Sequence, residues 1–272
     1  MPRPAVLAVP LAVAALAVVP VLALAGPEAT PVAVQEAFHR VESRGDFDVE
    51  VREGTPASVE IVAEPGQAGR IQVETSGDVL RLSRRREFDS ARGIVVRVVV
   101  PELRGLSVGG SGKGTAETGP AARDLQLGVS GSGDLDWKGT AAALDLGVSG
   151  SGHLEATGNS TRLGAGVSGS GALDVRGETG KASVAVSGSG DARLAGRAGS
   201  LEVRISGSGD VDAKAFPAKD VSVAIAGSGD ADVQLDGGTL SAQIAGSGDV
   251  RWSGEGKLGA VSTAGSGRVK RR

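Results

Sequence analysis

The chain has 272 residues, with 29 basic and 32 acidic side chains, a formal net charge of −3, 44 glycines and no cysteine. This charge balance gives no electrostatic footprint for nucleic acid, and the lack of cysteine excludes disulfides and thiol chemistry. Apolar residues make up 40% of the chain and recur periodically, so the composition predicts an ordered fold despite its glycine content.

Residues 1–25 have the pattern of a secretory signal peptide. Arg3 gives a positive start, the stretch from Ala5 to Leu22 is apolar, and the cleavage site ends at Ala25. An uncleaved anchor is the alternative. No cysteine follows the cleavage site, which excludes a lipoprotein anchor. The rest of the chain has no second long apolar run, so we expect no transmembrane segment after cleavage. We expect export to the periplasm, the cell surface or the medium, and a linker over 26–37.

Residues 38–105 lack the later repeat and predict a β-rich N-terminal cap. Alternating apolar and polar residues indicate short strands at 47–51, 58–62, 71–73, 79–82 and 94–100. A stack of strands needs blunted ends, because an open coil presents unpaired edges. The charges of Lys270, Arg271 and Arg272 are expected to block pairing at the other end.

Residues 106–272 carry a repeat of about 19 residues, marked by the tripeptide Gly-Ser-Gly. Its nine serines are Ser111, Ser132, Ser151, Ser170, Ser189, Ser208, Ser228, Ser247 and Ser266. Residues around each serine alternate between apolar and polar, as in Leu127 and Val129 before Ser132 and Leu135 after it. This pattern predicts one strand entering the tripeptide and one leaving it.

A single repeat cannot fold alone. Its inward apolar residues contribute roughly 10 kcal/mol, whereas ordering its backbone costs roughly 20–40 kcal/mol. The repeats must therefore stack, with strands about 4.8 Å apart. The sequence predicts an all-β parallel β-helix, or solenoid, of about nine coils.

The glycines beside each serine predict a sharp bend without room for a Cβ atom. Strict alternation places the serine ladder outward, although a bend could reverse it. We expect short turns at 138–140 and 157–160. The two tryptophans, Trp137 and Trp252, share one repeat position and are expected in the core or at its ends.

Five repeats continue the tripeptide with aspartate, and the last four lie on consecutive coils. These four are Asp191, Asp210, Asp230 and Asp249, and the fifth is Asp134. We expect turn aspartates that are solvated or bonded to backbone N–H groups. The alternative is a calcium-binding ladder, for which one carboxylate per coil is a thin ligand set because calcium takes six to eight oxygens. No other cofactor is expected.

No other motif supports catalysis. The segment 109–113 resembles a phosphate loop, but Ser107 and Gly114 stand where that motif needs glycine and a hydroxyl residue. His39 and His153 lack metal-ligand spacing. An outward row of carboxylates, as in β-helix enzymes that cleave polysaccharides, is interrupted by Arg193 and Arg251. Such an enzyme is the less favoured alternative.

The repeated phrase from Val129 to Leu135, preceded by the segments 46–51 and 100–106, resembles the head GIN domain of putative auto-transporter adhesins over roughly residues 36–268. The resemblance implies an exported bacterial protein with a right-handed β-helix-like fold and no catalytic residues. We therefore expect a non-catalytic cell-envelope module, adhesin-like or structural, that uses its repetitive polar faces. Its expected partner is an unidentified envelope or surface component, either protein or glycan.

Overall fold

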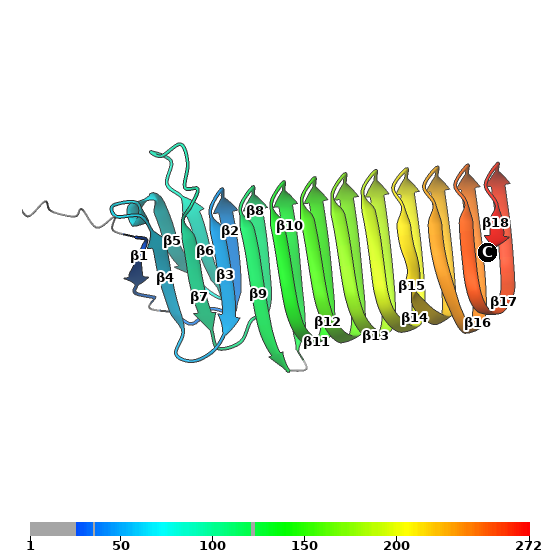
Figure 1. Ribbon diagram of the computed structural model, residues 1–272, viewed down its shortest axis with the longest axis horizontal. Helices are drawn as coiled ribbons and strands as arrows, with labels where there is room; N and C mark the ends of the chain where they lie inside the picture. Colours follow the sequence, from blue (N-terminus) through cyan, green and yellow to red (C-terminus); the bar gives the residue numbers. More distant parts are fainter. Residues whose placement is uncertain (1–25, 35, 121–122) are drawn as a thin grey trace, which may run out of the picture.

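The computed structural model describes residues 26–34, 36–120 and 123–272. The strands form one 18-stranded sheet that winds into coils stacked along a single axis (Figure 1). The predicted all-β parallel solenoid with a repeat of about 19 residues is therefore confirmed. The expected signal peptide and its cleavage site at Ala25 lie outside the described residues. Among the described residues, no helix is long and apolar enough to cross a membrane.

The N-terminal cap contains seven strands and one short 3-10 helix at Ala68–Arg70. Its strands are β1 (Glu28–Val32), β2 (Arg40–Gly45), β3 (Asp48–Glu53), β4 (Ser58–Ala63), β5 (Ile71–Ser76), β6 (Val79–Arg84) and β7 (Val95–Val100). Five of them match the predicted strands to within a few residues. The sequence analysis missed β2, and β1 lies within the expected linker over 26–37.

Chain order and spatial order differ in the cap. Strands β2 and β3 form an early coil that lies between β6 and β7 on one side and β8 and β9 on the other. Gly45 pairs with Gly110, so the segment Gly45–Phe47 takes the place of the Gly-Ser-Gly bend. At the far end, β1, β4 and β5 pair antiparallel with their neighbours. The direction reversal ends the solenoid at its N-terminal side.

The solenoid proper runs from β8 to β18 with parallel neighbours, and bulges shift the register within β9–β11, β14–β15, β15–β16 and β16–β17. Its strands are β8 (Gly105–Gly110), β9 (Lys113–Pro120), β10 (Asp124–Gly131), β11 (Asp134–Gly150), β12 (His153–Gly169), β13 (Ala172–Gly188), β14 (Asp191–Gly207), β15 (Val211–Gly227), β16 (Ala231–Gly246), β17 (Val250–Gly265) and β18 (Val269–Arg271). Equivalent residues pair, as Leu135 does with Leu154 and Val148 with Val167. Identical positions thus form ladders along the stack.

The expected turns at 138–140 and 157–160 do not interrupt the strands. Strand β11 continues from Asp134 to Gly150, because the neighbouring coil bends at the same place and Gly139 still pairs with Gly158. Only the Gly-Ser-Gly segment separates one long strand from the next. Each coil therefore has two arms, one before and one after the Gly-Ser-Gly bend.

One apolar core fills the space between the two arms along the whole stack. Every second residue of each arm points inward, as Leu125, Leu127 and Val129 do on β10. Trp137 is buried and donates a hydrogen bond from Nε1 to Thr118 Oγ1 at 3.1 Å. Trp252 is also buried, near the C-terminal end, with Arg271 stacked over its ring at 4.8 Å.

Candidate functional site: two ladder faces

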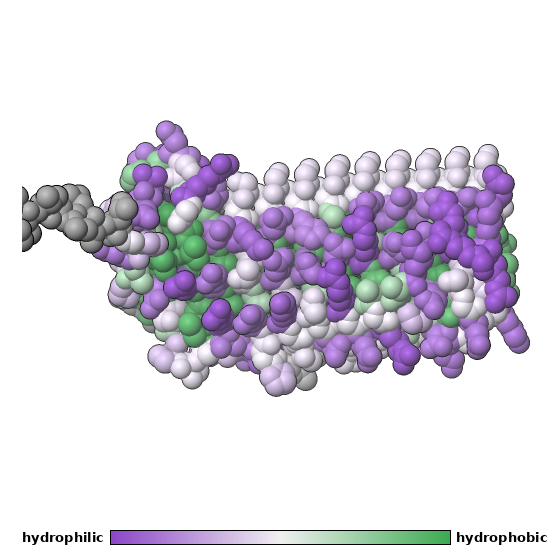
Figure 2. Space-filling view, in the orientation of Figure 1, coloured by the Kyte–Doolittle hydropathy of each residue, from purple (hydrophilic) through white to green (hydrophobic). Residues whose placement is uncertain are grey.

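The Gly-Ser-Gly bends form a continuous outer edge of the stack. All nine bend serines are exposed, so their ladder faces solvent. In the space-filling view this edge is a pale row of small residues that runs along the stack (Figure 2). In the Gly-Ser-Gly coils the bend requires glycine on both sides of the serine. Gly131 has a φ of 120°, and a Cβ atom on Gly133 would lie 2.4 Å from the carbonyl oxygen of Gly112.

The arm before each bend presents unusually small outward residues. Two positions before the bend serines stand Gly109, Ser130, Ser149, Ser168, Ser187, Ser206, Ala226, Ala245 and Ala264. Four positions before them stand Ser107, Gly128, Gly147, Gly166, Ala185, Arg204, Ala224, Gln243 and Ser262. We call the surface made by these two rows the small-residue groove.

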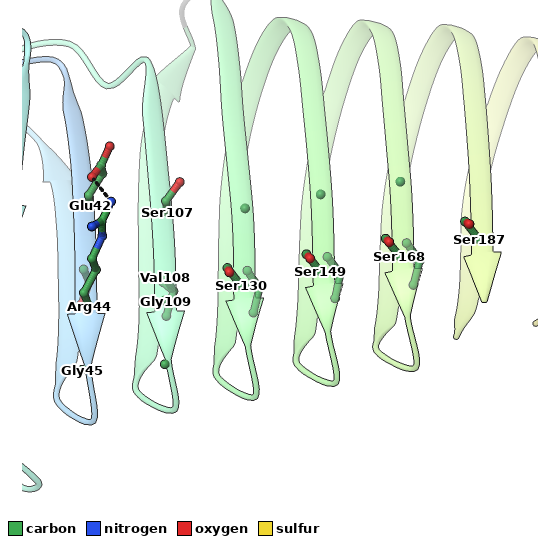
Figure 3. Close-up of a pocket in the computed structure, with 18 of the residues that line it drawn as sticks. Glu42, Arg44, Gly45, Ser107, Val108, Gly109, Ser130, Ser149, Ser168 and Ser187 are labelled. Carbon is green, nitrogen blue, oxygen red and sulfur yellow. Dashed lines mark hydrogen bonds and ion pairs between the residues drawn. The ribbon is translucent and has the colours of Figure 1, made fainter. Parts of the chain in front are cut away.

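The groove is hollowed along most of the stack. One hollow of about 1110 Å³ runs from β2 to Ser187, and a second of about 520 Å³ continues from Ala185 to Ala264. The close-up shows Ser130, Ser149, Ser168 and Ser187 at equivalent places on consecutive strands (Figure 3). Beyond the cap, the outward residues of the first hollow are all glycine, serine or alanine. The cap end carries Glu42, Arg44 and Arg84.

Glycine in the floor of this groove is not required by packing. A Cβ atom on Gly147 would meet no heavy atom within 4 Å, and one on Gly166 would only touch the Leu146 carbonyl oxygen at 3.9 Å. Neither residue has a positive φ. Glycine within a strand lowers stability by roughly 0.5–1 kcal/mol relative to alanine and often marks a place where a ligand or another backbone approaches closely. The bend glycines are needed for the fold, but these glycines are not.

The arm after each bend carries the charged face, which consists of the positions two, four and six residues after the bend serines. The four candidate metal ligands lie on this face and form one ladder. Asp191 begins β14, and Asp210, Asp230 and Asp249 directly precede β15, β16 and β17. Their carboxylates accept hydrogen bonds from the backbone of the following coil. In each case Oδ1 accepts from the N–H at the same repeat position of the next coil. The four hydrogen bonds are Asp210 to Asp191 at 3.3 Å, Asp230 to Asp210 at 2.8 Å, Asp249 to Asp230 at 2.8 Å and Arg268 to Asp249 at 3.0 Å.

The aspartate ladder replaces a backbone acceptor. In the preceding coils, the N–H of His153 and Ala172 donates to the carbonyl oxygens of Gly133 and Gly152 at 3.1 Å. Once aspartate occupies the position, its carboxylate takes over that role for the next coil. Asp134 is an exception, because the N–H of His153 keeps its glycine acceptor. Asp48 in the cap extends the same ladder, since its Oδ1 accepts from the N–H of Lys113 at 2.9 Å.

Basic side chains neutralise much of the ladder. Arg251 donates to Asp230 Oδ2 at 2.7 Å, and Lys270 lies 3.2 Å from Asp249 Oδ2. The hydrogen bond from Lys270, together with the backbone N–H of Arg268, holds the pKa of Asp249 below its ordinary value. The contact with Asp230 raises the pKa of Arg251. Mutual repulsion in the ladder is therefore offset by cations and by backbone donors.

The remaining sequence candidates do not come together. His39 lies in the cap, where Nδ1 is 2.5 Å from Asp78 Oδ1, while His153 lies on the charged face with Nε2 3.4 Å from Asp174 Oδ2. Lys113 pairs with Asp136 at 2.6 Å. Within residues 26–34, 36–120 and 123–272, no group of three or more histidine and acidic side chains is arranged to hold a metal ion.

Sequence analysis missed the small-residue groove, although its signal was present. The two outward positions nearest the bend hold only glycine, serine or alanine in the repeats up to Ser187, whereas the outward residues after each bend are mostly long or charged. It also missed Asp48, because the cap coil has no Gly-Ser-Gly tripeptide to align on.

These features define a repetitive β-solenoid with two extended faces. Residues 37–179 and 161–256 match the family model described as "Putative auto-transporter adhesin, head GIN domain". The chain belongs to this family, as its sequence resemblance indicated. None of the curated proteins compared with the chain matches it.

Three solved structures from Parabacteroides share the fold. A putative adhesin from Parabacteroides merdae has a TM-score of 0.71 at 19% identity and covers 91% of this chain and 96% of its own. A putative adhesin from Parabacteroides distasonis has a TM-score of 0.70 at 19% identity, with coverages of 90% and 97%. A putative lipid binding protein from Parabacteroides distasonis has a TM-score of 0.68 at 18% identity, with coverages of 91% and 97%.

Proposed function

We propose that the protein is a non-catalytic binding module of the cell envelope that holds an extended ligand along the small-residue groove. Export rests on the signal-like segment 1–25 and agrees with the adhesin family. A binding role agrees with the repeat, which places the same residue types at equivalent positions along the stack, as in the bend serines and the ladder from Asp191 to Asp249. The partner is then recognised by many equivalent weak contacts.

This proposal rests on groove glycines whose positions have room for a larger side chain. Gly147 and Gly166 leave open space on a strand face, so their small size keeps the groove clear without helping the fold. A ligand that approaches the backbone closely explains why a residue that weakens a strand stands there.

We propose a neutral glycan chain as this ligand. Between Gly109 and Ser187 the groove offers serine hydroxyls and glycine C–H groups without an ionisable side chain. A hydroxyl both donates and accepts hydrogen bonds, which suits sugar hydroxyls. Coils repeat about every 4.8 Å, a spacing close to the length of one sugar unit in an extended chain.

Binding of cello-oligosaccharides and of fully N-acetylated chito-oligosaccharides of increasing length tests this proposal. We expect affinity to rise with length until the chain spans the groove. The variant Gly147→Phe should fill the groove and weaken binding by about tenfold or more. Ala172→Phe, on the charged face of a nearby coil, is the matched control and should bind normally. Failure of every neutral oligosaccharide to bind, or normal binding by Gly147→Phe, would contradict the proposal.

A lipid acyl chain is a second candidate for the C-terminal half of the groove. There the serine row changes to Ala226, Ala245 and Ala264, which form an apolar strip beside Arg204 and Gln243. A fluorescent fatty acid should then bind in competition with unlabelled fatty acid, and Ala245→Lys should abolish its binding while Ser149→Lys should not. Equal loss in both variants would contradict an acyl-chain site in this half.

A further inference from the structure

In the part of the chain that the structure describes, the last long strand, β17, has an edge that no other strand covers along its second arm. Strand β18 pairs only with Val250, Arg251 and Trp252 at the start of β17. On the arm before the bend, residues Leu258 to Gly265 pair with β16 on one side. No described residue pairs with their other side. The stack therefore presents eight residues of free strand edge at this end (Figure 1).

The opposite end of the stack is protected. Its outermost strands, β1 and β5, reverse direction. Strand β1 carries Glu28 and Pro31, and β5 carries Glu74. Charged residues and proline on an edge discourage pairing with another chain. Residues Leu258 to Gly265 contain neither a charge nor a proline.

This edge also exposes side chains that belong to the core position. Leu258 and Val261 are 48% and 41% exposed, and they are the large exposed hydrophobic residues of the described chain. Their partners one coil earlier, Leu240 and Ala242, are buried. An added strand would bury Leu258 and Val261 as β17 buries the coil before it. Its backbone would also pair with the free N–H and C=O groups.

Two cations bracket the free edge. Lys257 precedes Leu258, and Arg268 follows the last bend; both are exposed. Neither forms an ion pair with a described acidic side chain. The other basic residues at this end are engaged, since Lys270 and Arg272 contact Asp249 and Asp232 and Arg271 stacks on Trp252. An uncharged edge with a free cation at each end favours a strand that is apolar in its middle and acidic at its ends.

We propose that the edge Leu258–Gly265 binds an extended polypeptide segment of this kind by β-strand addition. The partner strand pairs with the free backbone, places apolar side chains over Leu258 and Val261, and sets acidic residues beside Lys257 and Arg268. A second copy of this chain fits less well, because it would bring its own Lys257 and Arg268 to the same place. This site is separate from the small-residue groove.

A synthetic peptide tests the proposal directly. In this peptide valine alternates with threonine between terminal glutamates, and its binding to the purified chain is measured by fluorescence anisotropy and by hydrogen exchange. We expect binding that weakens with salt and protects the amides of residues 258–265. The double variant Lys257→Glu/Arg268→Glu should weaken binding by about tenfold or more. Val261→Lys, which puts a charge on the edge, should abolish it.

Control peptides and variants separate the outcomes. The same peptide with terminal lysines, or with methylated backbone amides, should not bind, and Ser149→Lys in the groove should bind normally. Equal binding of the lysine and glutamate peptides would overturn the charge argument. Protection outside residues 258–265, or no binding, would overturn the site. A concentration-dependent dimer that Val261→Lys abolishes would assign the edge to a second copy and overturn the proposed partner.

Discussion

Asp210 Oδ1 accepts a 2.8 Å hydrogen bond from the backbone N–H of Asp230, which stands at the same repeat position one coil further along the stack. The carboxylate thus connects two coils at the point where each chain leaves its bend. Replacing Asp210 by alanine removes the acceptor of this exposed hydrogen bond, and we expect a loss of about 0.5–1.5 kcal/mol in the free energy of unfolding. Asp210→Asn keeps an acceptor oxygen and should lose less. Urea denaturation measures both values.

The same ladder offers a matched control for this prediction. Asp134 occupies the equivalent position, but the N–H of His153 donates to Gly133 instead. Asp134→Ala should therefore change stability by only a few tenths of a kcal/mol, as is usual for surface substitutions. Equal losses in the Asp134 and Asp210 variants would show that the coil-to-coil hydrogen bond is not the cause.

Calcium should leave the thermal stability unchanged. One oxygen of each carboxylate from Asp191 to Asp249 accepts a backbone hydrogen bond, and calcium needs six to eight oxygen ligands. Melting curves with added calcium and with a chelator should coincide. A rise in Tm with calcium that the variant Asp210→Asn removes would instead support the calcium-stabilised alternative.

Acid should weaken the cap through Asp46. Burial raises the pKa of this carboxyl, but hydrogen bonds from Ser90 and the N–H of Ala91, together with Arg84, bring it below its ordinary value. A carboxyl with a lowered pKa in the folded state stabilises the fold above its unfolded value, near 3.9. That stability is lost as the pH falls through the lower folded value.

Denaturation of the wild type and of Asp46→Asn checks this prediction. The difference in stability between the two proteins should be constant near neutral pH and should shrink below about pH 4. Ser90→Ala is a second variant that should reduce the same pH dependence, because it removes one of the donors to Asp46. A difference that stays constant down to acid denaturation would contradict the role of Asp46.

The sequence was sufficient to predict the stacked coils because the same apolar and polar pattern recurs in every repeat. Leu135, Leu154 and Leu173 occupy one position on successive coils, so alternation and spacing reinforce each other. The insertion of β2 between β6 and β8, and of β3 between β7 and β9, could not be predicted, because pairing between distant segments leaves no periodic signal. The continuity of β11 through Gly139 was missed for a related reason. A turn residue in one coil predicts the end of a strand, whereas the stacked neighbour preserves the strand's hydrogen bonds.

The candidate site was predictable only in part. The ladder from Asp191 to Asp249 follows from its regular spacing, but its role depends on which N–H each carboxylate reaches. That contact is set by the offset between coils and is not encoded in any one repeat. The groove escaped notice because its small residues counted only as the polar positions of an alternating strand. Only the structure distinguishes the two kinds of glycine. A Cβ atom added to Gly133 would lie 2.4 Å from a carbonyl oxygen, whereas one added to Gly147 would meet open space.

Alanine substitutions should separate these two kinds of glycine. Gly131 has a φ of 120° and would place a Cβ atom 2.6 Å from the Gly110 carbonyl oxygen. Gly131→Ala should therefore cost at least about 1–3 kcal/mol through backbone strain alone. Gly147→Ala meets no such obstacle and should stabilise the protein by roughly 0.5–1 kcal/mol. If the groove binds a glycan, the same Gly147→Ala change should weaken that binding. A gain in stability with a loss of affinity would show that this glycine serves the ligand and not the fold, whereas a loss of stability would place Gly147 with the bend glycines.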